Sequence, residues 1–257
     1  MPSKLFDLTG KVAIVTGSSR GLGLASARGL AEHGAKVVIS GRKSTPCDEA
    51  AAQIRAEGGQ AIAQPCNIGR KDEIDALVGR AIDAWGRVDI VMANAAIHPW
   101  IGSALELEDA TFDKFMQVNV LSSLWLVQGT FPGMIERGWG RFISVGSIVG
   151  RVGDAVTGTY GLTKAADMQM VRNLACEFGA KGITANCIAP GTFRTEMART
   201  QWEDGAMVEW YCGRNPSARF GEPEEIAGLA VLLASPSGGY INGQTIHADG
   251  GHTISFR

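Results

Sequence analysis

The 257-residue sequence has few of the features that mark several large classes of protein. It contains only 9 prolines and no Gly-X-Y period, which excludes collagen and proline-rich disorder. Its 24 basic and 26 acidic residues leave a net charge of −2, and no run of Lys and Arg could follow a nucleic acid or an anionic membrane. We therefore expect no nucleic-acid partner.

Long apolar segments and paired cysteines are also missing. No apolar run approaches the ~18 residues that a membrane span needs, and the first residues lack the apolar core of a signal peptide. The 5 cysteines are odd in number and never spaced as Cys-x-x-Cys, which favours reduced structural thiols. These features predict a cytoplasmic protein without a membrane partner.

Glycine, in contrast, is abundant: the chain has 34, about 13%, against an average usage of about 7%. With 45% hydrophobic residues the chain can bury a large core. The glycines therefore need local reasons, such as turns, tight packing or a ligand pressed against backbone.

Short β-branched runs alternate with helical patterns along the whole chain. Strands are expected at 11–16, 36–40, 61–65, 88–93, 141–145, 183–188 and 244–248, and helices at 20–33, 48–57, 72–85, 110–131, 160–178 and 223–234. This alternation predicts right-handed βαβ units in one α/β domain over residues 1–257. The parallel sheet would have about seven strands, with helices on both faces.

The expected helices 110–131 and 160–178 are apolar nearly all round. A helix of this kind is buried on more than one side. The pattern favours a sheet on one side and a second subunit on the other, in a homotetramer or homodimer; a deep core in a monomer is the alternative.

Residues 16–23, Thr-Gly-Ser-Ser-Arg-Gly-Leu-Gly, follow the first strand and open the first helix. Their free N–H groups and the helix N-terminus form an anion site, and the glycines let a pyrophosphate approach the backbone. No Gly-Lys-Ser/Thr follows, so this is not a P-loop. The context predicts a dinucleotide site, with a plain tight turn as the alternative.

The end of the second strand is where a carboxylate would bind the 2′-hydroxyl of NAD. Here the chain reads Ser-Gly-Arg-Lys at 40–43, with no acid before Asp48. Arg42 and Lys43, with Arg20 nearby, suit a 2′-phosphate. This favours NADP(H), leaves NAD(H) possible, and has a solvated basic turn as its alternative.

Tyr160 and Lys164 lie four residues apart, on one face of an expected helix. A tyrosine with its ordinary pKa of about 10 is a poor acid or base at pH 7, and a nearby ammonium favours the phenolate. Ser147 follows a strand thirteen residues earlier, and its hydroxyl could donate to a carbonyl oxygen. Taken alone, such residues are common on protein surfaces.

The motifs occur in a fixed order along the chain: Thr16–Gly23, Asn94-Ala95-Ala96, Asn119, Ser147, Tyr160 with Lys164, Pro190-Gly191, and Asp249-Gly250-Gly251. This set resembles the short-chain dehydrogenase/reductase family over essentially the whole chain. The resemblance implies a Rossmann-type, doubly wound sheet and an oxidoreductase that uses NAD(P). Three stretches, at 40–43, 94–100 and 186–191, are most similar to the NADP-dependent carbonyl and retinal reductase branch.

The resemblance also implies a catalytic tetrad. Tyr160 would be the general acid in reduction and the base in oxidation, and Lys164 would hold the nicotinamide ribose. Ser147 would orient the substrate carbonyl. Asn119 would hold a water that continues the proton relay.

Cofactor contacts are implied by the same resemblance. They fall on Gly17, Ser19, Arg20, Gly21, Leu22, Gly23, Arg42, Lys43, Asn67, Ile68, Asn94, Ala95, Tyr160, Lys164, Pro190, Gly191, Phe193 and Thr195. The chain departs from the family at Asn67, where an aspartate is usual, and at Ala96, where a glycine is usual.

Residues 193–217 correspond to a mobile substrate lid in the family. Its aromatic and methionine side chains favour an apolar or aromatic ketone or aldehyde and the matching alcohol. Substrate contacts are expected at Ser147, His98, Trp100, Trp202 and Met197, unless the lid residues only pack onto the body.

Several other functions stay open. The substrate could be a 3-oxoacyl carrier or a sugar or polyol, and a different class of protein, a non-catalytic nucleotide sensor, could keep this fold. The intact tetrad favours an enzyme, because a sensor needs none of it. His247, Asp249 and His252 are spaced like metal ligands, but strand alternation leaves His252 in a turn, so no metal is expected.

Overall fold

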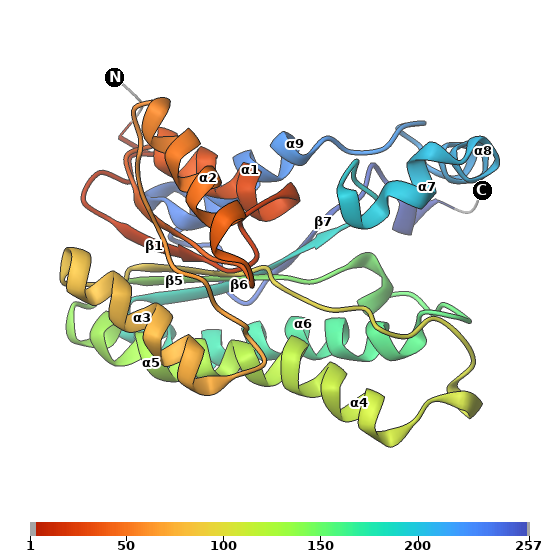
Figure 1. Cartoon of the computed structure of the whole chain (residues 1–257), viewed down its shortest axis with the longest axis horizontal. Helices are drawn as coiled ribbons and strands as arrows, with labels where there is room; N and C mark the ends of the chain where they lie inside the picture. The colour runs from red at the N-terminus through yellow and green to blue at the C-terminus, as the bar shows by residue number, and fades with distance from the viewer. Residues whose placement is uncertain (1–3, 256–257) are drawn as a thin grey trace.

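Seven parallel strands form one sheet in the computed structural model, which describes residues 4–255 without the side chain of Met197 (Figure 1). The strands are β1 (Val12–Val15), β2 (Lys36–Ile39), β3 (Gln60–Ala63), β4 (Ile90–Ala93), β5 (Gly140–Val145), β6 (Ile183–Pro190) and β7 (Thr245–Ala248). Their order across the sheet is β3-β2-β1-β4-β5-β6-β7. The chain winds outward first from β1 to β3 and then from β4 to β7, so the sheet is doubly wound and its topological switch point lies between β1 and β4.

Helices cover both faces of the sheet. They are α1 (Gly21–Glu32), α2 (Ser44–Ala56), α3 (Lys71–Trp85), α4 (Asp109–Phe115), α5 (Ser122–Glu136), α6 (Gly158–Phe178), α7 (Arg199–Glu203), α8 (Gly205–Arg214) and α9 (Pro223–Ala234). Figure 1 shows α1, α2 and α9 on one face and α3, α5 and α6 on the other. The expected Rossmann-type α/β fold is confirmed.

Each face of the sheet has its own apolar core. In β1, Ala13 and Val15 pack into the core under α1, α2 and α9, whereas Val12 and Ile14 pack into the core under α3, α5 and α6. Strands that are buried on both faces consist of continuous apolar residues, which makes them easy to recognise in the sequence.

Two expected helices differ from the structure by more than two residues at one end or in their continuity. The helix expected at 110–131 is divided: α4 passes into a π-helical segment, η2 (Met116–Leu121), before α5 continues to Glu136. The helix expected from 48 begins at Ser44, because Pro46 lies in its first turn, where its missing N–H breaks no helix bond.

The segment after β6 is helical, although its residues follow little regular pattern. Residues 193–217 form a short 3-10 turn, then α7 and α8, and then lead to α9. Asp204 caps α8 by accepting from the N–H groups of Ala206 and Met207. Within residues 4–255, no helix is both long and apolar enough to span a bilayer.

Candidate active site

The carboxyl ends of β1 and β4 meet at the switch point, and the glycine-rich loop starts there. Gly17 and Gly21 have φ angles of +64° and +58°, a region that favours glycine. A Cβ at Gly23 would lie 2.5 Å from the Asn94 side-chain nitrogen and 2.5 Å from the carbonyl oxygen of Gly17. The loop therefore folds tightly onto the residue that follows β4.

Asn94 is the side chain that holds this loop. Its Nδ2 donates to the carbonyl oxygens of Thr16 at 2.8 Å and Gly17 at 3.2 Å. The Thr16 hydroxyl in turn accepts from the N–H groups of Asn94 and Ala95, each at 3.1 Å. Asn94 thus shapes the loop through its backbone, and Ala96 replaces the usual glycine without entering the left-handed region.

The loop faces the segment that follows β6. A Cβ at Gly21 would lie 3.5 Å from the methyl group of Thr195, so the two segments come close. Gly191 turns the chain against Asp249, whose Cα lies 2.9 Å from a Cβ built there. Phe193 is buried and its ring lies against Gly221, so its side chain packs the core while its backbone borders the site. Pro190 ends β6 at the same edge.

The basic residues expected at the ribose are placed to receive an anion. Arg20, Arg42 and Lys43 are exposed, and none of them forms an ion pair with a carboxylate of residues 4–255. Gly41 leaves little room beside Ser19, whose Oγ would lie 3.0 Å from a Cβ at that position. These residues fit a 2′-phosphate.

Three of the residues expected to contact the cofactor differ in their surroundings. Asn67 is exposed, and its Oδ1 accepts from the N–H of Gly69 at 3.1 Å. Ile68 is buried in the core beneath α3. Leu22 packs partly against the opposite core, so it fixes the start of α1.

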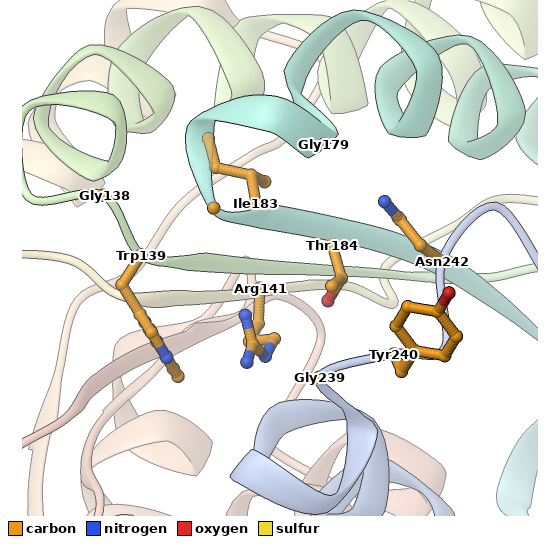
Figure 2. Close-up of a pocket in the computed structure, with 10 residues that line it drawn as sticks. Gly138, Trp139, Arg141, Gly179, Ile183, Thr184, Gly239, Tyr240 and Asn242 are labelled. Carbon is orange, nitrogen blue, oxygen red and sulfur yellow. The ribbon is translucent and has the colours of Figure 1, made fainter.

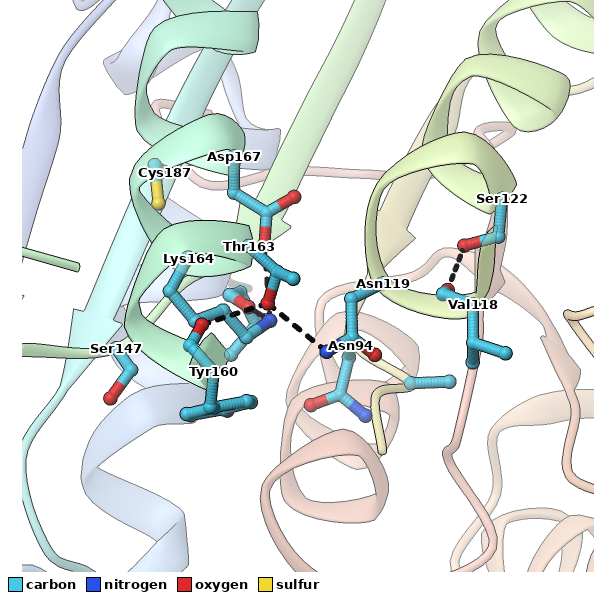
Figure 3. A network of polar contacts seen from close by, with 12 residues as sticks. Asn94, Val118, Asn119, Ser122, Ser147, Tyr160, Thr163, Lys164, Asp167 and Cys187 are labelled. Atoms are coloured by element: carbon cyan, nitrogen blue, oxygen red, sulfur yellow. Dashed lines mark hydrogen bonds and ion pairs between the residues drawn. The ribbon is translucent and has the colours of Figure 1, made fainter. Parts of the chain in front are cut away.

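Tyr160 and Lys164 lie on the first turns of α6, beside Ser147 (Figure 3). Ser147 caps a short 3-10 turn, Ile148–Gly150, and its Oγ accepts from the N–H of Val149 at 3.4 Å. Two glycines allow this turn to touch α6. A Cβ at Gly150 would lie 2.7 Å from the carbonyl carbon of Lys164, and one at Gly161 would lie 2.7 Å from the carbonyl oxygen of Val149.

The ammonium of Lys164 is buried, with 3% of the side chain exposed. It donates to the carbonyl oxygen of Val145 at 2.7 Å and to the Asp167 carboxylate at 3.0 Å. An ammonium has three N–H donors, so one remains for a ligand at the site. Burial opposes the charge, but Asp167 and then Tyr160 outweigh it, and the pKa of Lys164 lies above its ordinary value.

Asn119 lies in the π-helical segment and is buried. Its Oδ1 accepts from the N–H of Ile97 at 2.9 Å, and its Nδ2 donates to the Ile97 carbonyl at 3.0 Å and to the Thr163 hydroxyl at 3.1 Å. The amide therefore ties the loop after β4 to α6. A π-helical turn often marks a functional position in a helix.

The expected substrate residues divide into two groups. The His98 ring stacks on Tyr160, with ring centroids 4.5 Å apart, and burial lowers the pKa of His98 despite Asp154 nearby. The buried Nε2 of His98 and Nε1 of Trp100 have no hydrogen-bond partner in the described part of the chain. Trp202 instead donates to the carbonyl oxygen of Thr195, and the side chain of Met197 lies outside the described residues.

A cavity of about 560 Å³ lies at the opposite edge of the sheet, at the amino ends of β5 and β6 (Figure 2). Arg141 lies over the Trp139 ring, 4.3 Å from its centroid, and donates to the carbonyl oxygen of Gly140. This cavity is remote from the tetrad. No cluster of His, Cys, Asp and Glu among residues 4–255 could hold a metal ion.

Comparison with known proteins agrees with this geometry. A family model described as enoyl-(acyl carrier protein) reductase, adh_short_C2, matches residues 17–253. Dehydrogenase/reductase SDR family member 4 of Oryctolagus cuniculus is 37% identical over 244 residues, 95% of this chain and 94% of the relative. The 5-keto-D-gluconate 5-reductase of Escherichia coli K12 is 34% identical over 254 residues, 98% of each chain.

A solved structure has the same fold. The gluconate 5-dehydrogenase of Burkholderia cenocepacia, in complex with NADP and tartrate, superposes with a TM-score of 0.93 at 33% identity, covering 98% of both chains. The family model and the relatives, which match nearly the whole chain, show that this chain belongs to the short-chain dehydrogenase/reductase family of oxidoreductases.

Proposed function

We propose that this protein is an NADP(H)-dependent oxidoreductase that interconverts a ketone or aldehyde and the corresponding alcohol. The observation that carries the proposal is the meeting of Ser147, Tyr160 and Lys164 beside the glycine loop, at the carboxyl edge of the sheet (Figure 3). A carbonyl there has a hydroxyl to orient it, a phenol to protonate it and an ammonium behind the phenol.

Each residue of the tetrad has a distinct part in the proposed reaction. The Ser147 hydroxyl donates to the carbonyl oxygen as negative charge develops on it. Tyr160 gives its proton to that oxygen in reduction and removes it in oxidation. Lys164 favours the phenolate form and holds the cofactor ribose with its third N–H, while Asn119 keeps α6 and the His98 loop in register. NADPH, when bound, supplies the hydride.

The preference for NADP(H) follows from the three exposed cations without carboxylate partners. Arg42, Lys43 and Arg20 would surround the 2′-phosphate, and Arg42 can bind it through two N–H groups. The Burkholderia relative was crystallised with NADP, which supports the same preference here.

The substrate class rests on the lid and on the wall beside Tyr160. Trp210 and Met207 of α8 leave 47% and 40% of their surface exposed, which suits an apolar or aromatic carbonyl compound. His98 and Trp100, however, carry buried nitrogens that have no hydrogen-bond partner among residues 4–255, and these would suit a hydroxylated substrate. A sugar or polyol is therefore the second candidate, in line with the E. coli 5-keto-D-gluconate 5-reductase.

We also infer a homodimer or homotetramer in the cytoplasm. Leu121 at the end of η2, Leu124 of α5 and Leu162 of α6 expose apolar side chains on helices that cover the same face of the sheet. A second copy of the chain would cover this face. The five cysteines are all free, which supports a reducing compartment.

The cofactor preference can be tested at Arg42. We expect Arg42→Ala to raise the Kd of NADPH about tenfold and to leave the Kd of NADH unchanged, because a charge-assisted pair to the 2′-phosphate is lost. Arg80→Ala, an exposed cation of α3, is the matched control. Equal losses for both cofactors, measured by fluorescence titration, would contradict the assignment.

The chemistry can be tested at Tyr160. We expect Tyr160→Phe to lower kcat by about 1,000-fold while the Kd of NADPH stays within about twofold, because the proton donor is lost and the ring remains. The fully exposed Tyr240 provides the control, Tyr240→Phe, which should retain normal kcat.

The assay should compare an aromatic ketone, 5-keto-D-gluconate and a 3-oxoacyl thioester, each with NADPH and with NADH. If the enzyme turns over only 5-keto-D-gluconate, the proposed substrate changes from an apolar carbonyl compound to a sugar or polyol. A Tyr160→Phe enzyme with normal kcat would exclude the proposed chemistry and favour a nucleotide-binding protein without it.

The assembly can be tested by light scattering at micromolar concentration. We expect a dimeric or tetrameric mass, reduced by Leu162→Glu, because a carboxylate would be buried between apolar helices. Leu105→Glu is the control, because Leu105 is 97% exposed on a separate turn. A monomeric mass for the unchanged protein would refute the assembly.

A further inference from the structure

A second buried charge lies directly behind the tetrad. Asp167 follows Lys164 by one turn of α6, and the two side chains leave only 2% and 3% of their surface exposed. Its Oδ2 accepts from the Lys164 ammonium at 3.0 Å (Figure 3). A buried carboxylate at this place is costly unless it is paired, so the contact with Lys164 must compensate for its burial.

The groups that face Lys164 come from several elements. Tyr160 and Asp167 belong to α6, the Val145 carbonyl to β5, and the Cys187 thiol to β6. Asn119 of η2 reaches the same helix through the Thr163 hydroxyl.

Among the carboxylates of residues 4–255, Asp167 is the one paired with Lys164. Burial raises the pKa of Asp167, and the charge and hydrogen bond of Lys164 oppose that rise. Burial, followed by the charge of Asp167, raises the pKa of the Cys187 thiol to about 12, so that thiol is neutral. No other carboxylate of residues 4–255 forms an ion pair with the lysine.

Burial alone would remove the charge of the lysine. Lysines buried without a counter-charge can have pKa values several units below the ordinary value of about 10.4. In this protein burial is outweighed by the charge of Asp167, the charge of Tyr160 and the hydrogen bond to Asp167 together, and the pKa of Lys164 is raised instead. The charged state that the chemistry needs thus depends on a residue that does not face the substrate.

We propose that Asp167 is a positioning residue for catalysis: it keeps the buried Lys164 charged and turned so that one N–H faces the cofactor and Tyr160. The inference rests on the proposed function, because Lys164 matters to the reaction only if Tyr160 transfers the proton. Asp167 and the Val145 carbonyl occupy two of the three N–H donors. The orientation of the third is then fixed by the protein before any ligand binds.

The test is the pH dependence of Asp167→Asn. The asparagine keeps the shape and one oxygen for Lys164, and its nitrogen would face the Ser144 hydroxyl, which lies beside Asp167. In the unchanged enzyme Lys164 stays protonated well into the alkaline range, because its folded pKa is raised. In the variant the charge of Asp167 no longer opposes burial, so the lysine loses its proton at lower pH.

We expect the alkaline limb of kcat/KM for carbonyl reduction to move to lower pH by about one unit or more in Asp167→Asn. NADPH affinity should weaken several-fold over the same range, because the positive charge beside the cofactor is lost. NADPH titrations need no turnover. If the unchanged enzyme reduces no carbonyl, the proposed function fails, while NADPH binding against pH still decides the role of Asp167.

Asp89→Asn is the matched control. Asp89 is also fully buried and pairs with Arg87 and Arg137, but it lies just before β4, away from the tetrad. It should lose stability without moving either pH profile. If the pH profiles of Asp167→Asn do not move, as expected for Asp89→Asn, the proposal is overturned.

A second variant keeps the proposal testable if the asparagine enzyme does not fold. Asp167→Glu retains the charge and should preserve the position of the alkaline limb even if kcat is lower. If the alkaline limb of Asp167→Glu moves to lower pH as far as expected for the neutral Asp167→Asn, that result would also overturn the proposal.

Discussion

The burial of the Lys164 ammonium between α6 and the sheet is the constraint on which the site depends. A cation in this position must be compensated, and the compensation comes from the Val145 carbonyl and the Asp167 carboxylate. The lysine is therefore held by the fold through two of its three N–H groups.

The remaining catalytic groups reach Lys164 by close backbone approach. Gly150 and Gly161 let the turn that carries Ser147 touch α6, and a Cβ at either position would collide with backbone. Gly23 does the same between the phosphate loop and Asn94. The glycine excess of the sequence thus serves two purposes, since some glycines make room for a ligand and others allow elements of the protein to pack together.

The sequence was sufficient to predict the sheet and its parallel strands, while the catalytic roles of the tetrad stay a prediction. Strands buried on both faces and helices with clear stops leave strong local patterns, and the ordered motifs locate Tyr160 and Lys164. The π-helical turn at Asn119 was not predicted, because it depends on the bonds of its side chain to Ile97, in a different element. The helices α7 and α8 were missed for a similar reason, since their segment has no clear periodicity of its own.

The contact of Asp167 with Lys164 could have been predicted from the sequence, but only after both residues are assigned to one helix. It lies three residues after Lys164, so both face the same side of α6. Nothing in the sequence says that this side is buried against β5 and β6, and an exposed pair at this spacing contributes little. The packing of α6 against the sheet buries the ion pair of Lys164 and Asp167, and this burial gives a common helical spacing its importance.

We propose that this site transfers a hydride to a carbonyl carbon while Tyr160 supplies the proton. The most direct measurement uses NADPH deuterated on both faces of C4 and follows the alcohol product by mass spectrometry. We predict an alcohol with deuterium on its carbinol carbon. An alcohol without deuterium, formed in step with cofactor oxidation, would contradict the account.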